Sequence, residues 1–180
     1  MILRETKGAP LTHQEMDSNF KYAIFPPYVH IQEQLPSETR AGRIISGWQK
    51  RNINTVLINN IDNSSLNNNQ IILPKGKYYI DSNSTFTAYD ESNTGRISLY
   101  DVNNNIYLLH GANATASNSI RGRAGTILIV SGYFELENST NLELHIYSRI
   151  TGNMNYSLGL ICSIPNEPEI YTEELMEQEK

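Results

Sequence analysis

Hydrophobic and polar residues alternate over most of this chain of 180 residues. From residue 43 onward the alternation has a period of two, which places successive side chains on opposite faces of a β-sheet. Many short strands separated by turns are typical of an antiparallel sandwich or jelly roll. The pattern predicts ten strands, at residues 44–49, 53–61, 70–73, 77–89, 95–102, 105–111, 124–137, 141–150, 157–164 and 168–176.

The segments between these strands carry turn-forming residues. Pro74 and Gly76 fit the two corners of a tight turn. Segments 101–105 and 137–141 contain asparagine and favour hairpin connections, because asparagine tolerates the left-handed backbone conformation. The sequence therefore predicts a mainly β protein, a ten-stranded antiparallel jelly-roll sandwich with tight connections.

A different period appears near the start of the chain, where residues 12–24 are predicted to form a short helix. Thr12 can act as the N-cap, and Glu15 can reach back to the backbone N–H of Thr12, which completes a capping box. Leu11 and Met16 stand at the two positions of a hydrophobic staple. We therefore expect a helix that begins at a fixed residue.

Met16 also begins an apolar stripe that continues through Phe20 and Ile24 at intervals of four residues. This stripe either packs on its own domain or docks on another protein. Pro26 and Pro27 end the helix, because proline lacks the backbone N–H that a helix needs. The chain is thus predicted to have three parts: an N-terminal segment with the helix at 1–24, a linker at 25–42 and a head domain at 43–180.

Charge and composition exclude several classes of function. A net charge of −5 and a pI near 5.4 argue against nucleic-acid binding, which needs a basic surface. No apolar run reaches the length of a membrane span, and residues 1–5 lack the pattern of a signal peptide. We therefore expect synthesis in a cytoplasm and no membrane insertion. Cys162 is the single cysteine, which excludes an intrachain disulfide.

The sequence shows no catalytic or metal-binding pattern. The four histidines have none of the spacings typical of zinc sites. Asp90 and Glu91 are adjacent, so a regular strand would point them to opposite faces. Glu135 and Glu137 share a face, which we interpret as the solvent face. We therefore expect no enzyme, no metal site and no cofactor, with glycoside hydrolysis by such a carboxylate pair as the weaker alternative.

Loops rich in Asn, Ser and Thr join the predicted strands, and such side chains both donate and accept hydrogen bonds. An aromatic side chain nearby can support a sugar ring. Arg121 and Arg123 form a compact basic spot that can bind an anion, pair with an acidic residue of a neighbouring subunit, or stay solvated. The candidate contacts with a surface ligand are Asn104, Asn118, Arg121, Arg123, Asn153 and Tyr156.

The segment from Gly8 to Phe20 follows the pattern Gly-x-Pro-Leu-Thr-x-x-Glu-x-Asp-x-Asn-Phe. It resembles a segment at the N-terminus of many bacteriophage tail-fibre and minor virion proteins. The resemblance implies that the helix docks on another phage tail or baseplate protein. The residues that we expect to dock are Met16 of the apolar stripe and the motif residues Pro10, Leu11, Thr12, Glu15, Asp17, Asn19 and Phe20.

The body also carries a resemblance, over residues 44–176 and in pattern more than in identity. The run at 73–80 with its Pro-x-Gly-x-Tyr pattern, followed by the runs at 95–100, 125–136 and 141–147, resembles the jelly roll of complement-type globular heads and tumour-necrosis-factor-like domains. This resemblance implies a homotrimer packed about a three-fold axis by aromatic and aliphatic side chains. It also implies that the C-terminal strand, here 169–175, lies at the centre of the inner sheet.

Together these resemblances predict a bacteriophage virion structural protein located in the tail. It would be a short homotrimeric tail fibre or fibre tip that docks by its N-terminus to other tail or baseplate proteins. Its β head would serve host attachment by receptor binding, to a glycan or a protein of the host surface. One alternative keeps the fold and assigns it to a head or collar decoration, or an assembly fibre, with no receptor role. The other alternative is a glycan hydrolase.

Overall fold

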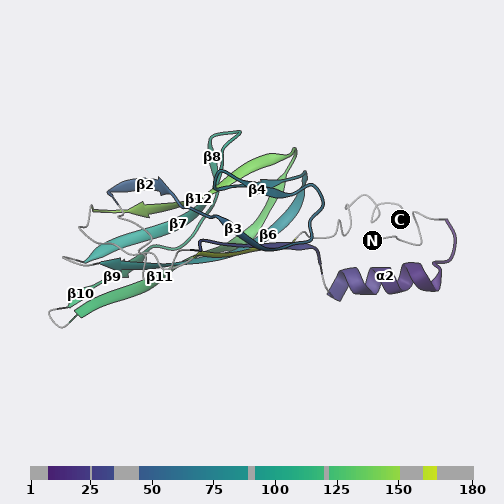
Figure 1. The fold of residues 1–180 in the computed structure, drawn as a ribbon, viewed down its shortest axis with the longest axis horizontal. Helices are drawn as coiled ribbons and strands as arrows, with labels where there is room; N and C mark the ends of the chain where they lie inside the picture. The colour runs from purple at the N-terminus through teal and green to yellow at the C-terminus, as the bar shows by residue number, and fades with distance from the viewer. Residues whose placement is uncertain are drawn as a thin grey trace, which may run out of the picture.

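The computed structural model describes residues 8–24, 26–34, 45–88, 92–119, 122–150 and 160–165. Within these ranges it contains one helix and thirteen strands (Figure 1). In chain order they are α2 (His13–Ile24), β1 (Tyr28–Gln32), β2 (Gly47–Lys50), β3 (Thr55–Asn59), β4 (Ser65–Asn67), β5 (Gln70–Leu73), β6 (Gly76–Ala88), β7 (Asn93–Asp101), β8 (Ile106–His110), β9 (Ala114–Ala116), β10 (Asn118–Ser119), β11 (Gly122–Leu136), β12 (Thr140–Ser148) and β13 (Leu160–Pro165).

The strands form two antiparallel sheets that face each other, and α2 lies beyond one end of the sandwich (Figure 1). One sheet has the order β10-β11-β6-β13-β1-β3. The other has the order β4-β5-β12-β7-β8, with β2 beside β12 and β9 beside β7. Neighbouring strands are mostly distant in sequence, which is the topology of a jelly roll and confirms the predicted sandwich.

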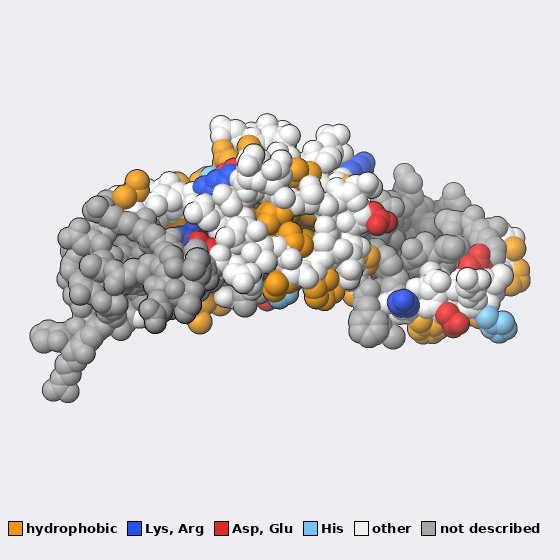
Figure 2. All heavy atoms as spheres, viewed as in Figure 1, with side chains coloured by type: hydrophobic (Ala, Val, Ile, Leu, Met, Phe, Trp, Pro, Cys, Tyr) orange, Lys and Arg blue, Asp and Glu red, His pale blue; other side chains and the backbone are white. Residues whose placement is uncertain are grey.

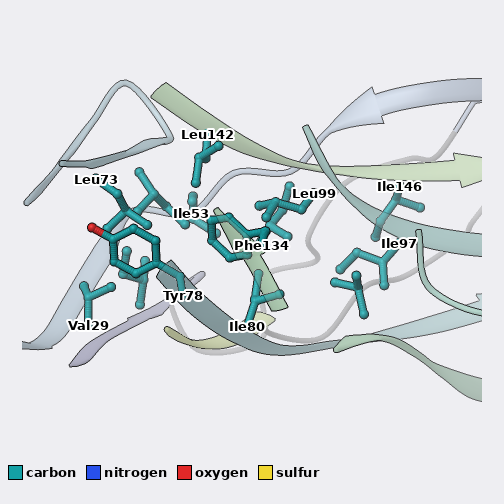
Figure 3. Close-up of a cluster of buried hydrophobic side chains, with 14 of the residues drawn as sticks. Val29, Ile53, Leu73, Tyr78, Ile80, Ile97, Leu99, Phe134, Leu142 and Ile146 are labelled. Atoms are coloured by element: carbon teal, nitrogen blue, oxygen red, sulfur yellow. The ribbon is translucent and has the colours of Figure 1, made fainter. Parts of the chain in front are cut away.

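The core lies between the two sheets and takes alternate residues from each strand. Ile97, Leu99 and Leu142 point inward from one sheet, where they meet Tyr78 and Ile80 from the other (Figure 3). All five are fully buried, and burial of such a side chain stabilises the fold by roughly 1.5–3 kcal/mol. The core therefore explains the period of two that runs through the sequence.

Asparagine occupies several turn positions, as expected from its preference for turns. Asn63, Asn68, Asn69 and Asn105 adopt positive φ angles, between 48° and 60°. Asparagine tolerates this left-handed conformation better than most residues do. The β7–β8 turn ends at Asn105, so the predicted hairpin at 101–105 is confirmed. The hairpin predicted at 137–141 is wrong, because β11 and β12 on either side of it belong to different sheets.

The predicted linker and strand count need correction. Residues 28–32 fall within the segment predicted as linker, yet they form β1, which pairs with both β13 and β3. Only Val29 and Ile31 of β1 are buried. Two apolar positions next to a pair of prolines are too few for an alternating strand pattern to be recognised in the sequence. The short strands β4, β9 and β10 were also not predicted, so the described residues hold thirteen strands where ten were expected in the whole chain.

The strand at the centre of the six-stranded sheet also differs from the expectation. We expected residues 169–175 there, but β13 occupies the place between β6 and β1. β13 corresponds to the strand predicted at 157–164. Residues 168–176, predicted as the last strand, lie outside the described residues.

Candidate functional site

The first candidate surface is the N-terminal helix α2, whose start is held by the predicted capping box. The backbone N–H of Glu15 donates to Thr12 Oγ1 at 3.2 Å, and the N–H of Thr12 donates to Glu15 Oε2 at 2.7 Å. The N–H of Met16 donates to the Thr12 carbonyl at 3.0 Å, which closes the first turn of the helix. Thr12 and Glu15 thus satisfy N–H groups that a helix start otherwise leaves free.

The helix presents an apolar residue to solvent. Phe20 is 69% exposed, whereas Met16, one turn earlier, is partly buried. Hydrophobic side chains are visible both on this helical end and on the sandwich (Figure 2). The structure places all of the predicted docking residues on one continuous segment at the start of the helix: Pro10, Leu11, Thr12, Glu15, Met16, Asp17, Asn19 and Phe20.

Of the six candidate ligand contacts, only Asn104 has a described side chain. It is exposed in the β7–β8 turn, where its backbone N–H and its Nδ2 donate to the Asp101 carboxylate at 3.0 and 2.8 Å. These hydrogen bonds stabilise the turn and engage the backbone N–H and the side-chain amide of Asn104. The backbones of Asn118 and Arg123 pair across β10 and β11. The side chains of Asn118, Arg121, Arg123, Asn153 and Tyr156 lie outside the described part of the chain.

The second candidate surface is the outer face of the six-stranded sheet, which is apolar along β11. Ile127, Ile129 and Tyr133 are 59%, 51% and 66% exposed. Tyr133 packs against Tyr79 of β6, with the ring centres 4.9 Å apart. The edge strand β3 adds exposed aliphatic side chains at Val56, Leu57 and Ile58; successive residues of a strand point to opposite faces, so these three line both sides of the sheet edge. We call Ile127, Ile129 and Tyr133, together with this exposed β3 edge, the apolar face.

The third candidate surface is the outer face of the seven-stranded sheet, where rings from four strands meet. We call it the ring face: Trp48 of β2, Tyr100 of β7, Tyr107 and His110 of β8, and His145 and Tyr147 of β12. The indole of Trp48 lies 4.6 Å from the ring of Tyr107 and 5.3 Å from that of Tyr147. Tyr100 stacks on His145 at 4.5 Å. All six are at least partly exposed.

A carboxylate with three donors lies beside these rings. Glu143 accepts hydrogen bonds from Lys50 at 2.6 Å, Gln70 at 2.7 Å and His145 at 2.8 Å. Burial alone would raise the pKa of Glu143, but these bonds outweigh it and lower the pKa to about 2. His145 also bonds to the hydroxyl of Tyr107 at 3.2 Å through Nδ1, so both of its ring nitrogens have a hydrogen-bond partner.

The opposite end of the ring face carries a positive charge. The guanidinium carbon of Arg96 lies 5.2 Å from the centre of the Trp48 ring, a cation–π contact. His110 shares a hydrogen bond of 2.8 Å with Ser98 through Nδ1. His110 is exposed as a whole, but partial desolvation of its ring and, after that, the charge of Arg96 lower its pKa, which favours the neutral imidazole.

Sequence reasoning missed the ring face. Alternation along β12 indicated that His145 and Tyr147 share a side, but nothing indicated that Trp48 reaches them. Within the described residues no group of three His, Cys, Asp or Glu could hold a metal ion. Nor is any described helix long and apolar enough to span a membrane. Glu135 and Glu137 are both exposed, on the solvent face predicted for them.

Comparison with known proteins bears on the fold. No protein-family model and no curated protein sequence matches this chain. Among solved structures, the crystal structure of murine APRIL at pH 8.0 is similar, with a TM-score of 0.51 and 10% sequence identity. The similarity covers 78% of this chain and 99% of that one. At this identity the likeness concerns the fold alone. The predicted resemblance to the tumour-necrosis-factor-like jelly roll is thereby confirmed as a likeness of fold.

Proposed function

We propose that this chain is a structural protein of a bacteriophage virion, a short homotrimeric tail fibre or fibre tip. Its N-terminal segment docks on other tail or baseplate proteins, and its β head contacts the host surface. The observation that carries the proposal is the capped helix α2, formed by residues with a phage docking pattern and placed beyond the sandwich with Phe20 exposed (Figure 1).

The helix is suited to docking because its start is fixed before any partner arrives. A lone helix of twelve residues is marginal in water, so a capping box that satisfies two N–H groups matters more here than in a packed helix. An exposed phenylalanine on such a helix gives a partner a large apolar contact. The sandwich has its own core and does not use Phe20.

The apolar face supports self-association. Large groups of exposed aliphatic and aromatic side chains on a protein surface often mark an interface with another protein. Here Ile127, Ile129 and Tyr133 line one strand, and β3 at the far edge of the same sheet offers three more. A cyclic assembly can bring the β11 side of one copy against the β3 side of the next. These observations favour the homotrimer that the fold resemblance implies.

The docking claim is tested by the double substitution Leu11→Asp with Thr12→Ala. It removes the cap and places a charge where the staple residue stood. We expect loss of incorporation into virions, while thermal melting of the sandwich in the purified full-length chain stays unchanged. His13→Ala, an exposed helix residue outside the docking pattern, is the control and is expected to be incorporated normally. Normal incorporation of the double variant would refute the docking role.

Self-association is tested by sizing with light scattering at micromolar concentration. The wild-type chain is expected to be a trimer, and Ile129→Asp a monomer. Ile106→Asp is a matched control, because Ile106 is 50% exposed and Ile129 is 51% exposed, but Ile106 lies on β8 in the other sheet. A monomeric wild-type chain, or dissociation of both variants alike, would contradict the trimer.

A further inference from the structure

The ring face carries an open platform of rings built across the sheet. β2 and β8 are separated in the sheet by β12 and β7, yet the indole of Trp48 reaches over both to lie 4.6 Å from Tyr107. Tyr147, from the strand beside β2, lies 5.3 Å from the same indole. Trp48, Tyr107 and Tyr147 are all partly exposed. The indole is tilted by 33° to the ring of Tyr107 and by 55° to that of Tyr147, so the rings pack on one another and each leaves part of its surface exposed. Exposed aromatic surface of this kind can pack against the C–H face of a sugar ring.

Next to the platform lies a cation, Arg96, for which the described part of the chain supplies no carboxylate partner. The carboxylate of Glu143 is already paired with Lys50 and His145, so it is not a partner for Arg96. Arg96, by contrast, has no hydrogen bond or ion pair to a carboxylate within the described residues, and its Nε is buried without a partner. A guanidinium has five N–H donors and no acceptor, and the two terminal nitrogens of Arg96, unlike its Nε, are not among the buried atoms without a partner, so they are the donors that an anion could reach.

The positive charge of Arg96 also acts on His110, which lies at the edge of the platform. It contributes, after burial, to the lowered pKa of His110, whose Nδ1 is bonded to Ser98. His110 is exposed and neutral, which suits it to a hydrogen bond with a hydroxyl group. The platform therefore combines aromatic rings, one imidazole and one guanidinium that has no carboxylate partner among the described residues.

We propose that the ring face binds an acidic sugar, whose pyranose ring stacks on Trp48 and Tyr107 and whose carboxylate pairs with Arg96. A planar carboxylate matches the fork of a guanidinium and can accept two parallel hydrogen bonds from it. A neutral sugar would leave those donors unpaired. A nucleic acid would stack on the rings too, but the chain has a net charge of −5. The inference rests on the proposed function for its setting, since it names the class of host-surface ligand.

The chain itself supplies the probe, because Trp48 is its single tryptophan. Excitation at the red edge of indole absorption therefore reports on the platform alone. The purified full-length chain is titrated with a tetrasaccharide of alternating glucuronic acid and N-acetylglucosamine, and in parallel with the N-acetylglucosamine tetramer. We expect saturable quenching or a spectral shift with the acidic tetrasaccharide, and binding at least ~10-fold weaker with the neutral one.

Three variants separate the carboxylate contact from general attraction. Arg96→Gln is expected to weaken binding of the acidic tetrasaccharide by about 10- to 100-fold. Arg96→Lys restores the charge without the planar fork and is expected to recover part of the affinity. Lys77→Gln removes one exposed positive charge from the other sheet and is expected to change the affinity by less than about 2-fold, since salt screens distant charges. Thermal melting verifies that each variant is folded.

Several outcomes would overturn the proposal. They are the absence of any response to the acidic tetrasaccharide, equal binding of the neutral one, and equal losses in Arg96→Gln and Lys77→Gln. A failure here is distinguishable from failure of the proposed function, because the titration needs neither virions nor the docking helix. Normal docking with no sugar response would reject the ring-face site alone.

Discussion

Glu143 is expected to make the stability of this fold depend on acid pH. Its carboxylate holds together three strands, since Lys50 lies on β2, Gln70 on β5 and His145 beside it on β12. The perturbation is the substitution Glu143→Gln, which keeps the shape of the side chain and removes its charge. Gln can still accept at one oxygen, but its NH2 group would face donors that already point toward it.

The magnitude follows from the pKa. The folded state lowers the pKa of Glu143 from 4.5 to about 2, and a tenfold change in proton affinity is worth ~1.4 kcal/mol. This corresponds to about 3 kcal/mol of stability for the ionised carboxylate. The side chain of Lys50 is 32% exposed, so solvent screening reduces the value, and we expect about 2 kcal/mol.

The sign is set by the direction of the change. Because the folded state lowers the pKa, the contribution of Glu143 is complete above pH 4.5 and is lost as the pH falls toward about 2. Urea unfolding of wild type and Glu143→Gln is measured at about pH 7 and about pH 3. The wild type should be more stable by about 2 kcal/mol at the higher pH, and the difference should shrink by more than half at the lower pH. A difference that is equal at both pH values would refute the reasoning.

Two further predictions concern the backbone and the helix. A Cβ at Gly111 would lie 2.0 Å from the carbonyl oxygen of Ile129, so Gly111→Ala should lower the free energy of unfolding, measured with urea, by more than ~3 kcal/mol. At Gly132 a Cβ would meet only the far end of the Leu109 side chain, at 3.3 Å, so Gly132→Ala should lower it far less. Equal costs would show that the two sheets do not approach closely at Gly111. Phe20→Ala should change the unfolding free energy by less than ~0.5 kcal/mol, while Phe86→Ala should cost ~3–5 kcal/mol, since Phe20 is 69% exposed and Phe86 is fully buried. A large loss in Phe20→Ala would mean that the helix packs on the head.

The fold could be predicted where one local pattern determined it. Alternation gave the long strands β7, β11 and β12, because their central inward positions are apolar, as at Ile97 and Leu99 in β7 and at Leu142, Leu144 and Ile146 in β12. The capping box could be predicted because both of its partners lie within three residues of each other. The strand β1 could not, since only Val29 and Ile31 mark its inward side.

The ring face was beyond a sequence-based prediction for a different reason. Its contacts join residues that are distant in sequence, such as Trp48 and Tyr107, and they depend on strand order and register. No local period encodes which strand lies beside β12. The same holds for Glu143, whose donors come from β2 and β5 as well as from its own strand. An alternating strand indicates which residues face outward, and only the assembled sheet shows what they face together.

The central claim is that the chain is a virion protein attached by its N-terminus to the phage tail. Immunogold electron microscopy of purified particles, with antibodies raised against the β head, tests it most directly. The account predicts label on the tail in wild-type particles and its loss when Leu11→Asp and Thr12→Ala are combined. Particles without label, or with label on the capsid alone, would contradict it.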